Sequence, residues 1–341
     1  MTKTAFPTPR VATAAPDSLR RHLTLGGLAS VLTPLAPVAF GADTPTWPTR
    51  AVRLLVGFPP GSSPDMSART LAEPLSQALG QPVVVDNRPG ASGNIAADLI
   101  AKANDDHTLG IVINGNLTSA KLLYSKLPYD PARDFALISL LTTAPLVLVA
   151  PANLPEGAAF FEAARAGGDK WNYGSVGNGS VAHLGMELLK SRDSRVQAAH
   201  IPYPGNPQVI TALLAGQIQM ALVPPGLAMP QVRAGKLKAI GLTSGRSTLV
   251  PELPPLADAG INNFNLEVWN ALIGPASLSR AAQQRLSQVV PGIVRDPAIR
   301  QRLFAQGWQA VGTAPDGLQT RLRDETAILG NIIRARDIRI E

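Results

Sequence analysis

The hydrophobic positions of the chain alternate between short apolar runs and longer stretches with helical spacing. Residues 52–58 form an apolar run typical of a buried strand, and two prolines and a glycine follow it. Beyond Asp65, apolar side chains recur at helical intervals from Ala68 to Leu79, which predicts an amphipathic helix that Gly80 closes. Strand and helix keep alternating in this way, so the pattern predicts an α/β fold in which helices cover both faces of mostly parallel sheets.

The predicted elements fall into two groups, which indicates two lobes. The first group holds further strands at residues 82–86 and 109–113 and a helix at 95–103. The tail at residues 279–336 is mainly helical. The second group begins with a strand and alternates strands with helices, in the order 171–175, 180–190, 196–201, 208–215, 218–223, 227–234 and 237–243.

Two apolar segments, residues 146–151 and 268–275, lie at the borders of these groups. We expect the first to carry the chain out of the first group and the second to bring it back before the helical tail. Two crossovers form a hinge, which allows a cleft between two lobes to close. We therefore expect residues 42–147 and 270–341 to form a discontinuous lobe 1, and residues 148–269 to form lobe 2.

Residues 1–41 have the order of charged, apolar and small residues that is typical of a secretory signal. Arg20 and Arg21 precede an apolar stretch at 23–40, and residues 39–41 are suited to cleavage by a signal peptidase. The stretch is short and interrupted by proline and glycine, so we expect a signal peptide, with a retained membrane anchor as the alternative. The paired arginines suggest twin-arginine export, although the motif around them is incomplete.

The composition favours a folded chain with large cores and excludes several kinds of chemistry. Of the 341 residues, 45% are hydrophobic and 16% are charged, which argues against disorder and leaves enough apolar surface for two cores. The absence of cysteine excludes disulfides and thiolate sites, and neither the histidines nor the acidic residues have metal-ligand spacing. The net charge of +7 fits an anionic ligand, but no basic run is interleaved with aromatic residues, so nucleic-acid binding is not expected.

The loop at residues 57–65 joins the first predicted strand to the first helix and could bind an anion. The first backbone N–H groups of a helix have no partner inside the helix and carry partial positive charge, so they can hold a carboxylate without a buried lysine. Ser62 and Ser63 could add hydroxyl donors, and Asp65 could cap the helix or orient the loop. The alternative is an ordinary capped turn with no ligand nearby.

A second loop of this kind, residues 173–180, joins a strand to a helix in the second group. Its three glycines let the backbone approach a ligand closely, and Ser175, Asn178 and Ser180 supply small polar groups. Ser180 could instead serve only as a helix cap. Two such loops, one from each lobe and placed face to face, would grip one anion from both sides.

Three further positions, Asn116, Gly205 and His183, are weaker candidates. Asn116 follows a predicted strand and could lie on the rim of the cleft. Gly205 belongs to a strand-to-helix loop that could equally be a plain turn. His183 lies one turn into the helix after the second loop, where it could reach the cleft or be an ordinary buried histidine.

The motifs give little support for an enzyme. Ser175 lies in a Gly-Ser-Val-Gly stretch, but a nucleophile elbow needs glycine two positions before the serine, where Tyr173 stands. No glycine-rich phosphate loop ends in Gly-Lys-Ser or Gly-Lys-Thr, and the first loop lacks the dinucleotide fingerprint. We therefore predict no catalytic residue, cofactor or metal, and a hydrolase that uses Ser175 is the alternative.

Several motifs in a fixed order carry a resemblance to a known family. With them the chain, from about Trp47 to Arg336, resembles the Bug family, the substrate-binding proteins of tripartite tricarboxylate transporters. The resemblance implies a two-lobed periplasmic binding protein with a type II-like fold. The motifs are FPPG at 58–61 with Asp65 and Ala68-Arg69, VDNRPGASGN at 85–94, YDP at 129–131 with Asp134-Phe135, YGS at 173–175 with GNGS at 177–180, and PYPG at 202–205.

The resemblance also implies a binding mode, in which both loops hold a small carboxylate through backbone groups, hydroxyls and bridging waters. This sequence departs from the family at Ser62, where a second glycine is usual, at Pro64, where threonine or a similar residue is usual, and at residues 223–225, which often include an acidic or amide residue. The identity of the ligand therefore stays open. The full set of candidate ligand-binding residues is Gly61, Ser62, Ser63, Asp65, Asn116, Ser175, Gly177, Asn178, Ser180 and Gly205.

The implied function is that of a periplasmic receptor, expected to be monomeric, that delivers a small carboxylate to integral membrane transporter subunits. A periplasmic ligand sensor for a signalling system would use the same pocket and is an alternative that the sequence does not separate.

Overall fold

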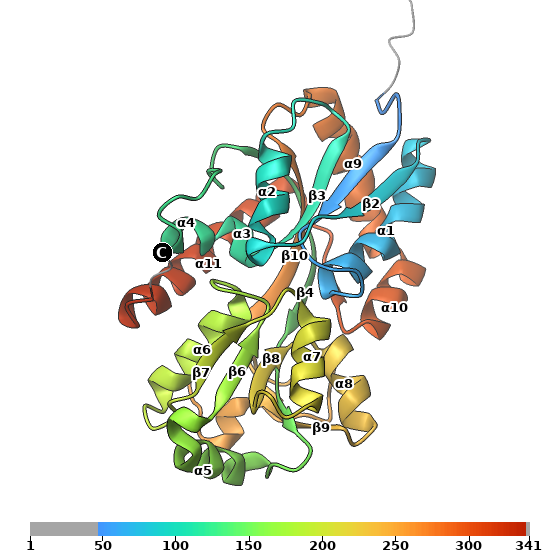
Figure 1. The fold of residues 1–341 in the computed structure, drawn as a ribbon. Coiled ribbons are helices and arrows are strands. Elements are labelled where there is room, and N and C mark those ends of the chain that lie inside the picture. The colour runs from blue at the N-terminus through green and yellow to red at the C-terminus, as the bar shows by residue number, and fades with distance from the viewer. Residues whose placement is uncertain (1–46, 339–341) are drawn as a thin grey trace, which may run out of the picture. The chain divides into compact units, whose positions relative to one another are not determined.

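The computed structural model describes residues 47–338, so the predicted signal peptide lies outside the described residues. These residues form two β-sheets with helices packed against them (Figure 1). The larger sheet and its helices are here called the six-stranded half. Its strands, in spatial order, are β11 (Gln309–Ala310), β4 (Phe135–Pro145), β10 (Glu267–Pro275), β3 (Thr108–Ile113), β1 (Val52–Val56) and β2 (Val83–Asn87). Its helices are α1 (Ser63–Leu79), α2 (Asn94–Ala101), α3 (Asn114–Leu117), α4 (Ala120–Leu123), α9 (Arg280–Arg295), α10 (Pro297–Ala305) and α11 (Pro315–Ala335).

The smaller sheet and its helices are here called the five-stranded half, which lies below the larger sheet in Figure 1. Its strands, in spatial order, are β7 (Ala199–Pro202), β6 (Asn172–Ser175), β8 (Met220–Val223), β5 (Val147–Pro151) and β9 (Leu237–Leu242). Its helices are α5 (Gly157–Gly167), α6 (Val181–Arg192), α7 (Asn206–Leu214) and α8 (Pro225–Arg233).

Helix α1 illustrates how local sequence sets the elements. Ser62, at the N-cap, has extended backbone angles, and a proline occupies the first turn, where a missing N–H costs no helical bond. Leu71 and Leu75 are one turn apart and buried, as the apolar spacing predicts. Gly80 ends the helix with a φ of +72°, a conformation that glycine adopts without strain.

Both sheets are mixed, which corrects the prediction of mostly parallel sheets. β1 pairs in parallel with β2 and β3, but β10 is antiparallel to both β3 and β4. In the smaller sheet, β6 is parallel to β7 and β8, whereas β5 is antiparallel to β8 and β9. The physical reason is the route of the chain: β4 leads from the larger sheet to the smaller one and β10 leads back, so these two neighbours run in opposite directions. Strand β4 was not predicted from the sequence.

The crossovers are shorter than predicted, because residues 146–151 and 268–275 lie almost entirely in strands. β4 ends at Pro145 and β5 begins at Val147, so the chain passes between the sheets over Leu146 alone. On the return path, Leu266 directly precedes β10. The predicted crossover segments are therefore strands β5 and β10, and the crossings themselves lie beside them.

Thr243, directly after β9, is hydrogen-bonded to both crossovers. Its N–H donates to the carbonyl oxygen of Leu146, and its carbonyl oxygen accepts from the N–H of Leu266, both at 2.9 Å. Its hydroxyl accepts from the N–H of Leu146 at 2.9 Å and donates to the carbonyl oxygen of Leu266 at 2.6 Å. Because Thr243 is fully buried, water cannot replace these bonds, and this one residue joins both crossings.

We expect Thr243→Val to destabilise the protein by about 2 kcal/mol, because a methyl group of similar size leaves a buried N–H and a buried carbonyl without their hydroxyl partner. Urea unfolding followed by circular dichroism measures the change. Thr211→Val is the matched control, since Thr211 is exposed, its hydroxyl donates only to the carbonyl oxygen of Pro207, and the loss of this bond should cost less than about 0.5 kcal/mol. Equal stability of Thr243→Val and the wild type would contradict the assigned role.

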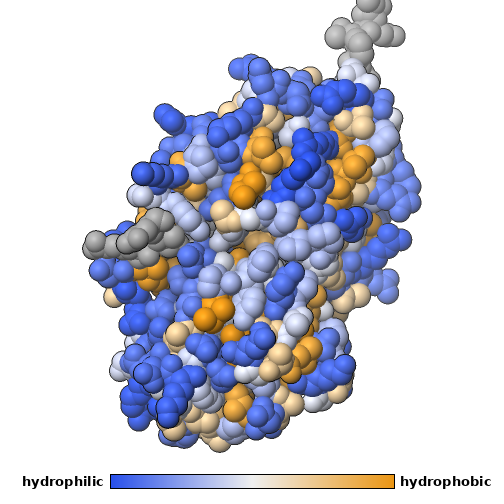
Figure 2. Space-filling model, viewed as in Figure 1, coloured by the Kyte–Doolittle hydropathy of each residue, from blue (hydrophilic) through white to orange (hydrophobic). Residues whose placement is uncertain are grey.

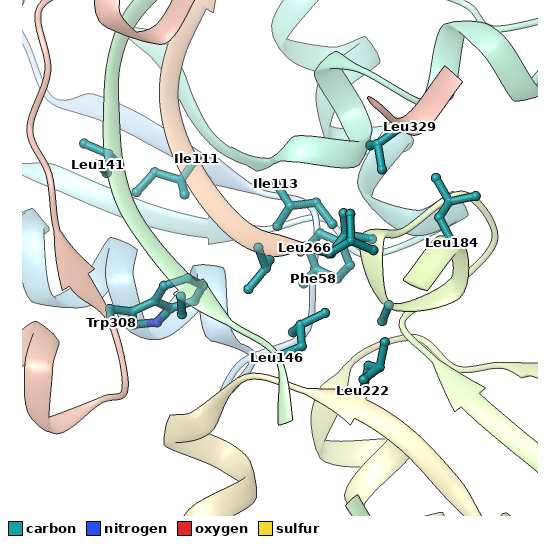
Figure 3. Packing of buried hydrophobic residues seen from close by; sticks show 14 of the residues in the cluster. Phe58, Ile111, Ile113, Leu141, Leu146, Leu184, Leu222, Leu266, Trp308 and Leu329 are labelled. Carbon is teal, nitrogen blue, oxygen red and sulfur yellow. The ribbon is translucent and has the colours of Figure 1, made fainter. Parts of the chain in front are cut away.

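Buried hydrophobic side chains continue from one half into the other. Figure 3 shows Phe58 and Ile113 of the six-stranded half, Leu146 between the sheets and Leu222 of β8 within the same cluster. The face seen in Figure 2 is largely hydrophilic, with separate hydrophobic patches on both halves. Within residues 47–338, no helix combines the length and the apolar character needed to cross a membrane.

Candidate binding site

A cavity lies where the two halves meet. Most of its wall is hydrophobic, and its polar lining comes from serine and asparagine side chains. The apolar lining residues are Phe58, Pro64, Ile113, Leu146, Val176, Val181, Ala182, Leu222, Pro224, Val268 and Trp308, and the polar ones are Ser63, Asn114, Ser180, Asn206 and Asn270.

Besides the single-turn helix α3, which begins at Asn114, four longer helices begin at this cavity: α1 of the six-stranded half and α6, α7 and α8 of the five-stranded half. Residues at or next to their first turns line it, namely Ser63 and Pro64 of α1, Ser180, Val181 and Ala182 at the start of α6, Asn206 of α7 and Pro224 before α8. Backbone N–H groups in a first helical turn lack partners inside the helix, and together with the helix dipole they favour a negative charge. Helix starts from both halves thus give the cavity an anion-attracting wall.

Helix α6 offers the most complete set of donors. Proline occupies the first or second position of α1, α7 and α8, and each proline removes one N–H from the first turn. The first turn of α6 has no proline, and Ser180 caps it by accepting from the N–H of His183 at 3.3 Å. An anion in the cavity would therefore find its best hydrogen-bond donors at Val181 and Ala182.

In the first loop, only Ser63 among the predicted residues lines the cavity. Asp65 is buried and accepts from the N–H of Gly61 and the Nδ2 of Asn87, both at 2.9 Å, and it forms an ion pair with Arg69. Asp65 therefore orients the loop, which is one of the two roles predicted for it. Ser62 is the N-cap residue of α1, and within the described part of the chain its buried Oγ has no hydrogen-bond partner.

In the second loop, Ser180 lines the cavity and the other predicted residues shape the turn. The Oγ of Ser175 accepts from the N–H of Gly177 and donates to its carbonyl oxygen, both at 3.1 Å. The Oγ of Ser180 donates to the same carbonyl at 2.8 Å. Gly177 has a φ of +112°, and a Cβ there would overlap Ser92 of the other half, so only glycine suits this position.

Asn116 and Asn178 lie at a smaller neighbouring cavity, and Ser180 borders both cavities. Asn116 accepts from the N–H of Ile113 at 3.3 Å and donates to Asn94 at 2.8 Å, so its amide holds the turn after β3. Gly205 is the N-cap residue of α7 and packs against Pro59.

The two halves are in direct contact around the main cavity. The Oγ of Ser119 donates to the carbonyl oxygen of Gly179 at 2.6 Å. The hydroxyl of Tyr124 donates to the main-chain carbonyl oxygen of Asn178 at 3.2 Å. Near the cavity wall, the Nδ2 of Asn206 donates to the Oγ of Ser63 at 3.3 Å. Each predicted loop thus bonds across to the other half, and Ser63 of the first and Ser180 of the second line the same cavity.

Histidine 183 does not line either cavity. Its Nδ1 accepts from the N–H of Gly179 at 3.2 Å, and its ring stacks on His200 with the ring centroids 4.2 Å apart. Burial lowers the pKa of His183 to about 4, and burial together with the neighbouring His183 lowers the pKa of His200 to about 3. Both rings are therefore neutral at neutral pH, and His183 acts as a buried structural histidine.

Ser175 and His200 are within hydrogen-bond distance, with 2.7 Å between Oγ and Nε2. The serine is buried and lies outside both cavity walls, and no carboxylate is bonded to His200 in the described residues. A nucleophilic serine needs access to its substrate and a base that a third group orients. This pair therefore serves the packing of β6 against β7.

Asn114, Asn206, Asn270 and Trp308 line the cavity but were not among the predicted site residues. Asn206 follows Gly205 and begins α7, and Asn114 follows the predicted strand at 109–113, so both positions carried a local signal. Asn270 is a polar residue in an otherwise apolar strand, which could also have marked it. Nothing in the local sequence distinguishes Trp308 from an ordinary core tryptophan.

No charged side chain lines the cavity among residues 47–338, and the same residues contain no cluster of three or more potential metal ligands.

The profile of the family described as "Tripartite tricarboxylate transporter family receptor" matches residues 67–338. The chain belongs to this family of receptors. The resemblance found in the sequence motifs is thereby confirmed.

Similar proteins and solved structures agree with the assignment of this chain to the receptor family. Protein BugT of Bordetella pertussis is 31% identical over 304 residues, which cover 88% of this chain and 93% of BugT. The structure of R. palustris Rpa4515 with adipate has a TM-score of 0.82 at 29% identity and covers 86% of this chain and 99% of that one. The structure of MatC from Rhodopseudomonas palustris with bound malate has a TM-score of 0.79 at 29% identity. The match covers 84% of this chain and 100% of the MatC chain. The receptor thus has the α/β fold of periplasmic binding proteins.

Proposed function

We propose that this receptor captures a small carboxylate in the periplasm and delivers it to integral membrane subunits of a tripartite tricarboxylate-type transporter. The observation that carries the proposal is the convergence of four long-helix starts, from both halves, on one cavity whose described lining has no basic side chain. Such a wall holds a carboxylate through backbone N–H groups and helix dipoles. The malate and adipate bound to two structural relatives support this ligand class.

We further infer that the two halves act as lobes that close on the ligand. Lobe 1 would comprise residues 42–147 and 270–341, and lobe 2 residues 148–269, with the crossings at Leu146 and Leu266 as hinges. Residues 1–41 would be the signal peptide that brings the receptor to the periplasm. A short hinge tied by Thr243 would let the halves rotate without unfolding either sheet.

A receptor without catalytic activity fits the site better than a serine hydrolase. The hydroxyl of Ser175 is bonded inside its own turn and does not reach the cavity. A ligand sensor would use the same cavity, and no observation on the described residues favours it over transport. Loss of uptake on deletion of the gene separates these two roles.

Calorimetry with mono-, di- and tricarboxylates tests the proposal, and at least one should give saturable heat. Ala182→Pro should weaken that binding about tenfold or more, because it removes a first-turn N–H that would bond a charged ligand. The neighbouring helices α1 and α7 already accommodate proline in their first turns, so the helix itself should persist.

Ala281→Pro is the matched control for this experiment. It occupies the same position in α9, which also begins with a capping serine, but it lies away from the cavity. Binding should be unchanged in this variant. Absence of heat across the whole panel, or equal affinity of Ala182→Pro and the wild type, would refute the proposed site.

A further inference from the structure

Two buried amide oxygens belong to residues that line the cavity and lack a hydrogen-bond partner. Within residues 47–338, the Oδ1 atoms of Asn114 and Asn270 are both without a partner, although each side-chain nitrogen is bonded. Both residues are fully buried. A buried polar atom without a partner is costly, so such an atom in a cavity wall indicates a group that the ligand or an ordered water supplies.

The orientation of the Asn114 amide is set by its surroundings. Its Nδ2 donates to the main-chain carbonyl oxygen of Glu267 at 3.1 Å and to the carboxyl group of Glu325. A main-chain carbonyl only accepts hydrogen bonds, so the amide cannot be turned round without losing this bond. Glu325 also accepts from the indole N–H of Trp269, which fixes its place behind the amide. Asn114 therefore presents its oxygen, an acceptor, as its free polar atom.

Asn270 places a second amide next to the first. It lies on β10 opposite Ile113 of β3, and Asn114 is the next residue along the chain. Its Nδ2 donates to the hydroxyls of Ser67 at 3.2 Å and Thr142 at 3.1 Å. The register of two neighbouring strands thus brings two hydrogen-bond acceptors to one part of the wall.

This part of the wall does not suit a second carboxylate. A carboxylate oxygen accepts hydrogen bonds and carries charge, so it would meet other acceptors and lose its hydration without gaining a donor. Among the cavity-lining residues of the described chain, no charged side chain could compensate the charge of a second carboxylate. An ammonium group would likewise find no charged side chain to compensate its charge there. The remaining lining is mainly apolar.

We propose that the ligand is a monocarboxylate with an apolar body and an uncharged hydrogen-bond donor, a hydroxyl or an amide, that faces the side-chain oxygens of Asn114 and Asn270. A primary amide has two hydrogens and can donate to both oxygens, whereas a hydroxyl has one hydrogen, which it donates to one oxygen or shares between the two. This inference rests on the proposed function, since the carboxylate itself is assigned to the helix starts. It narrows the substrate class from small carboxylates in general to hydroxylated or amide-bearing monocarboxylates.

Calorimetry on the intact receptor with two positional series tests this. The probes are the hydroxyhexanoates and the hydroxybenzoates, each compared with the analogue in which a methyl group replaces the hydroxyl and with adipate or a benzenedicarboxylate. We expect one hydroxylated monocarboxylate to bind about tenfold or more tightly than its methyl analogue and than the dicarboxylate, because only the hydroxyl offers a hydrogen to these acceptors.

Asn114→Leu should reduce this preference for hydroxyl over methyl to less than about threefold, because the acceptor is gone. Should that variant fail to fold, Asn270→Leu provides the same comparison, since Ser67 and Thr142 can rotate their hydroxyls toward other partners. If the methyl analogues or the dicarboxylates bind as tightly as the hydroxylated monocarboxylates, or more tightly, this inference is wrong. Such a result would not contradict the proposed receptor function. Absence of binding by any carboxylate, or equal affinity of Ala182→Pro and the wild type, would instead refute the proposed function itself.

Discussion

Replacement of Gly226 by alanine should raise the dissociation constant of the ligand at least about a hundredfold while leaving both halves folded. Gly226 lies in the first turn of α8, and its backbone contacts the turn at Gln306 and Gly307 of the six-stranded half. A Cβ on Gly226 would overlap the carbonyl oxygen of Gln306 and lie 2.5 Å from its carbonyl carbon. These are backbone atoms, so no side chain can move aside.

The overlap disappears when the halves separate, so the variant should populate an open form. If the closed form falls below about 1% of molecules, the apparent affinity falls by the same factor. Alanine is a better helix former than glycine, so α8 should not be weakened. Calorimetry gives the affinity, and small-angle X-ray scattering should show that ligand no longer makes the variant more compact.

Gly292→Ala is the matched control for closure. Gly292 lies inside α9, and a Cβ there meets no atom within 4 Å. This variant should bind like the wild type and be slightly more stable. Wild-type affinity in Gly226→Ala would show that the contact between α8 and the Gln306 turn is not needed for binding.

Acidification from pH 7.5 to pH 5 should reduce the free energy of unfolding by roughly 3 kcal/mol through His183 and His200. Burial lowers the pKa of His183 to about 4 and that of His200, which also faces His183, to about 3, whereas an unfolded histidine titrates near 6.5. Below pH 6.5 the unfolded chain therefore binds protons that the folded chain does not, so stability is lost as the pH falls.

The loss should be complete only below the folded pKa values, and the stability due to these groups should be fully present above pH 6.5. Each pKa unit corresponds to about 1.4 kcal/mol, and the share of His200 is smaller because its ring is only partly buried. Nearby Glu187 opposes the shift of both histidines and Lys190 reinforces it, but burial is the larger cause for each.

Urea unfolding at pH 7.5 and pH 5.0 measures this effect, and most carboxylates remain ionised over that interval. The double variant His183→Gln/His200→Gln should be less stable than the wild type at pH 7.5 but should lose much less stability on acidification. A drop of the same size in the double variant would assign the pH dependence to other groups.

Local sequence was sufficient to predict most of the elements around the site. The starts of α1 and α6 follow from serine, proline and glycine at particular positions, because capping and positive φ depend on a few neighbouring residues. The alternation of strand and helix indicated two sheets, and the paired loops indicated helix starts from both halves. The antiparallel β4 and β10 were beyond this reasoning, since strand direction depends on which segments become neighbours.

The sequence by itself therefore determined the α/β class, the receptor family motifs and the two loops that carry helix starts. The tertiary structure alone decided which side chains reach the cavity. It bonded Asp65 to Gly61 and Asn87, and Ser175 to Gly177 and His200, instead of placing either side chain in the cavity. It also brought Asn114 and Asn270 to the wall of one cavity through the register of β3 and β10. The physical reason is that capping and helical periodicity are local, whereas the direction of a side chain and the partners of a buried amide depend on strands that are distant in the sequence.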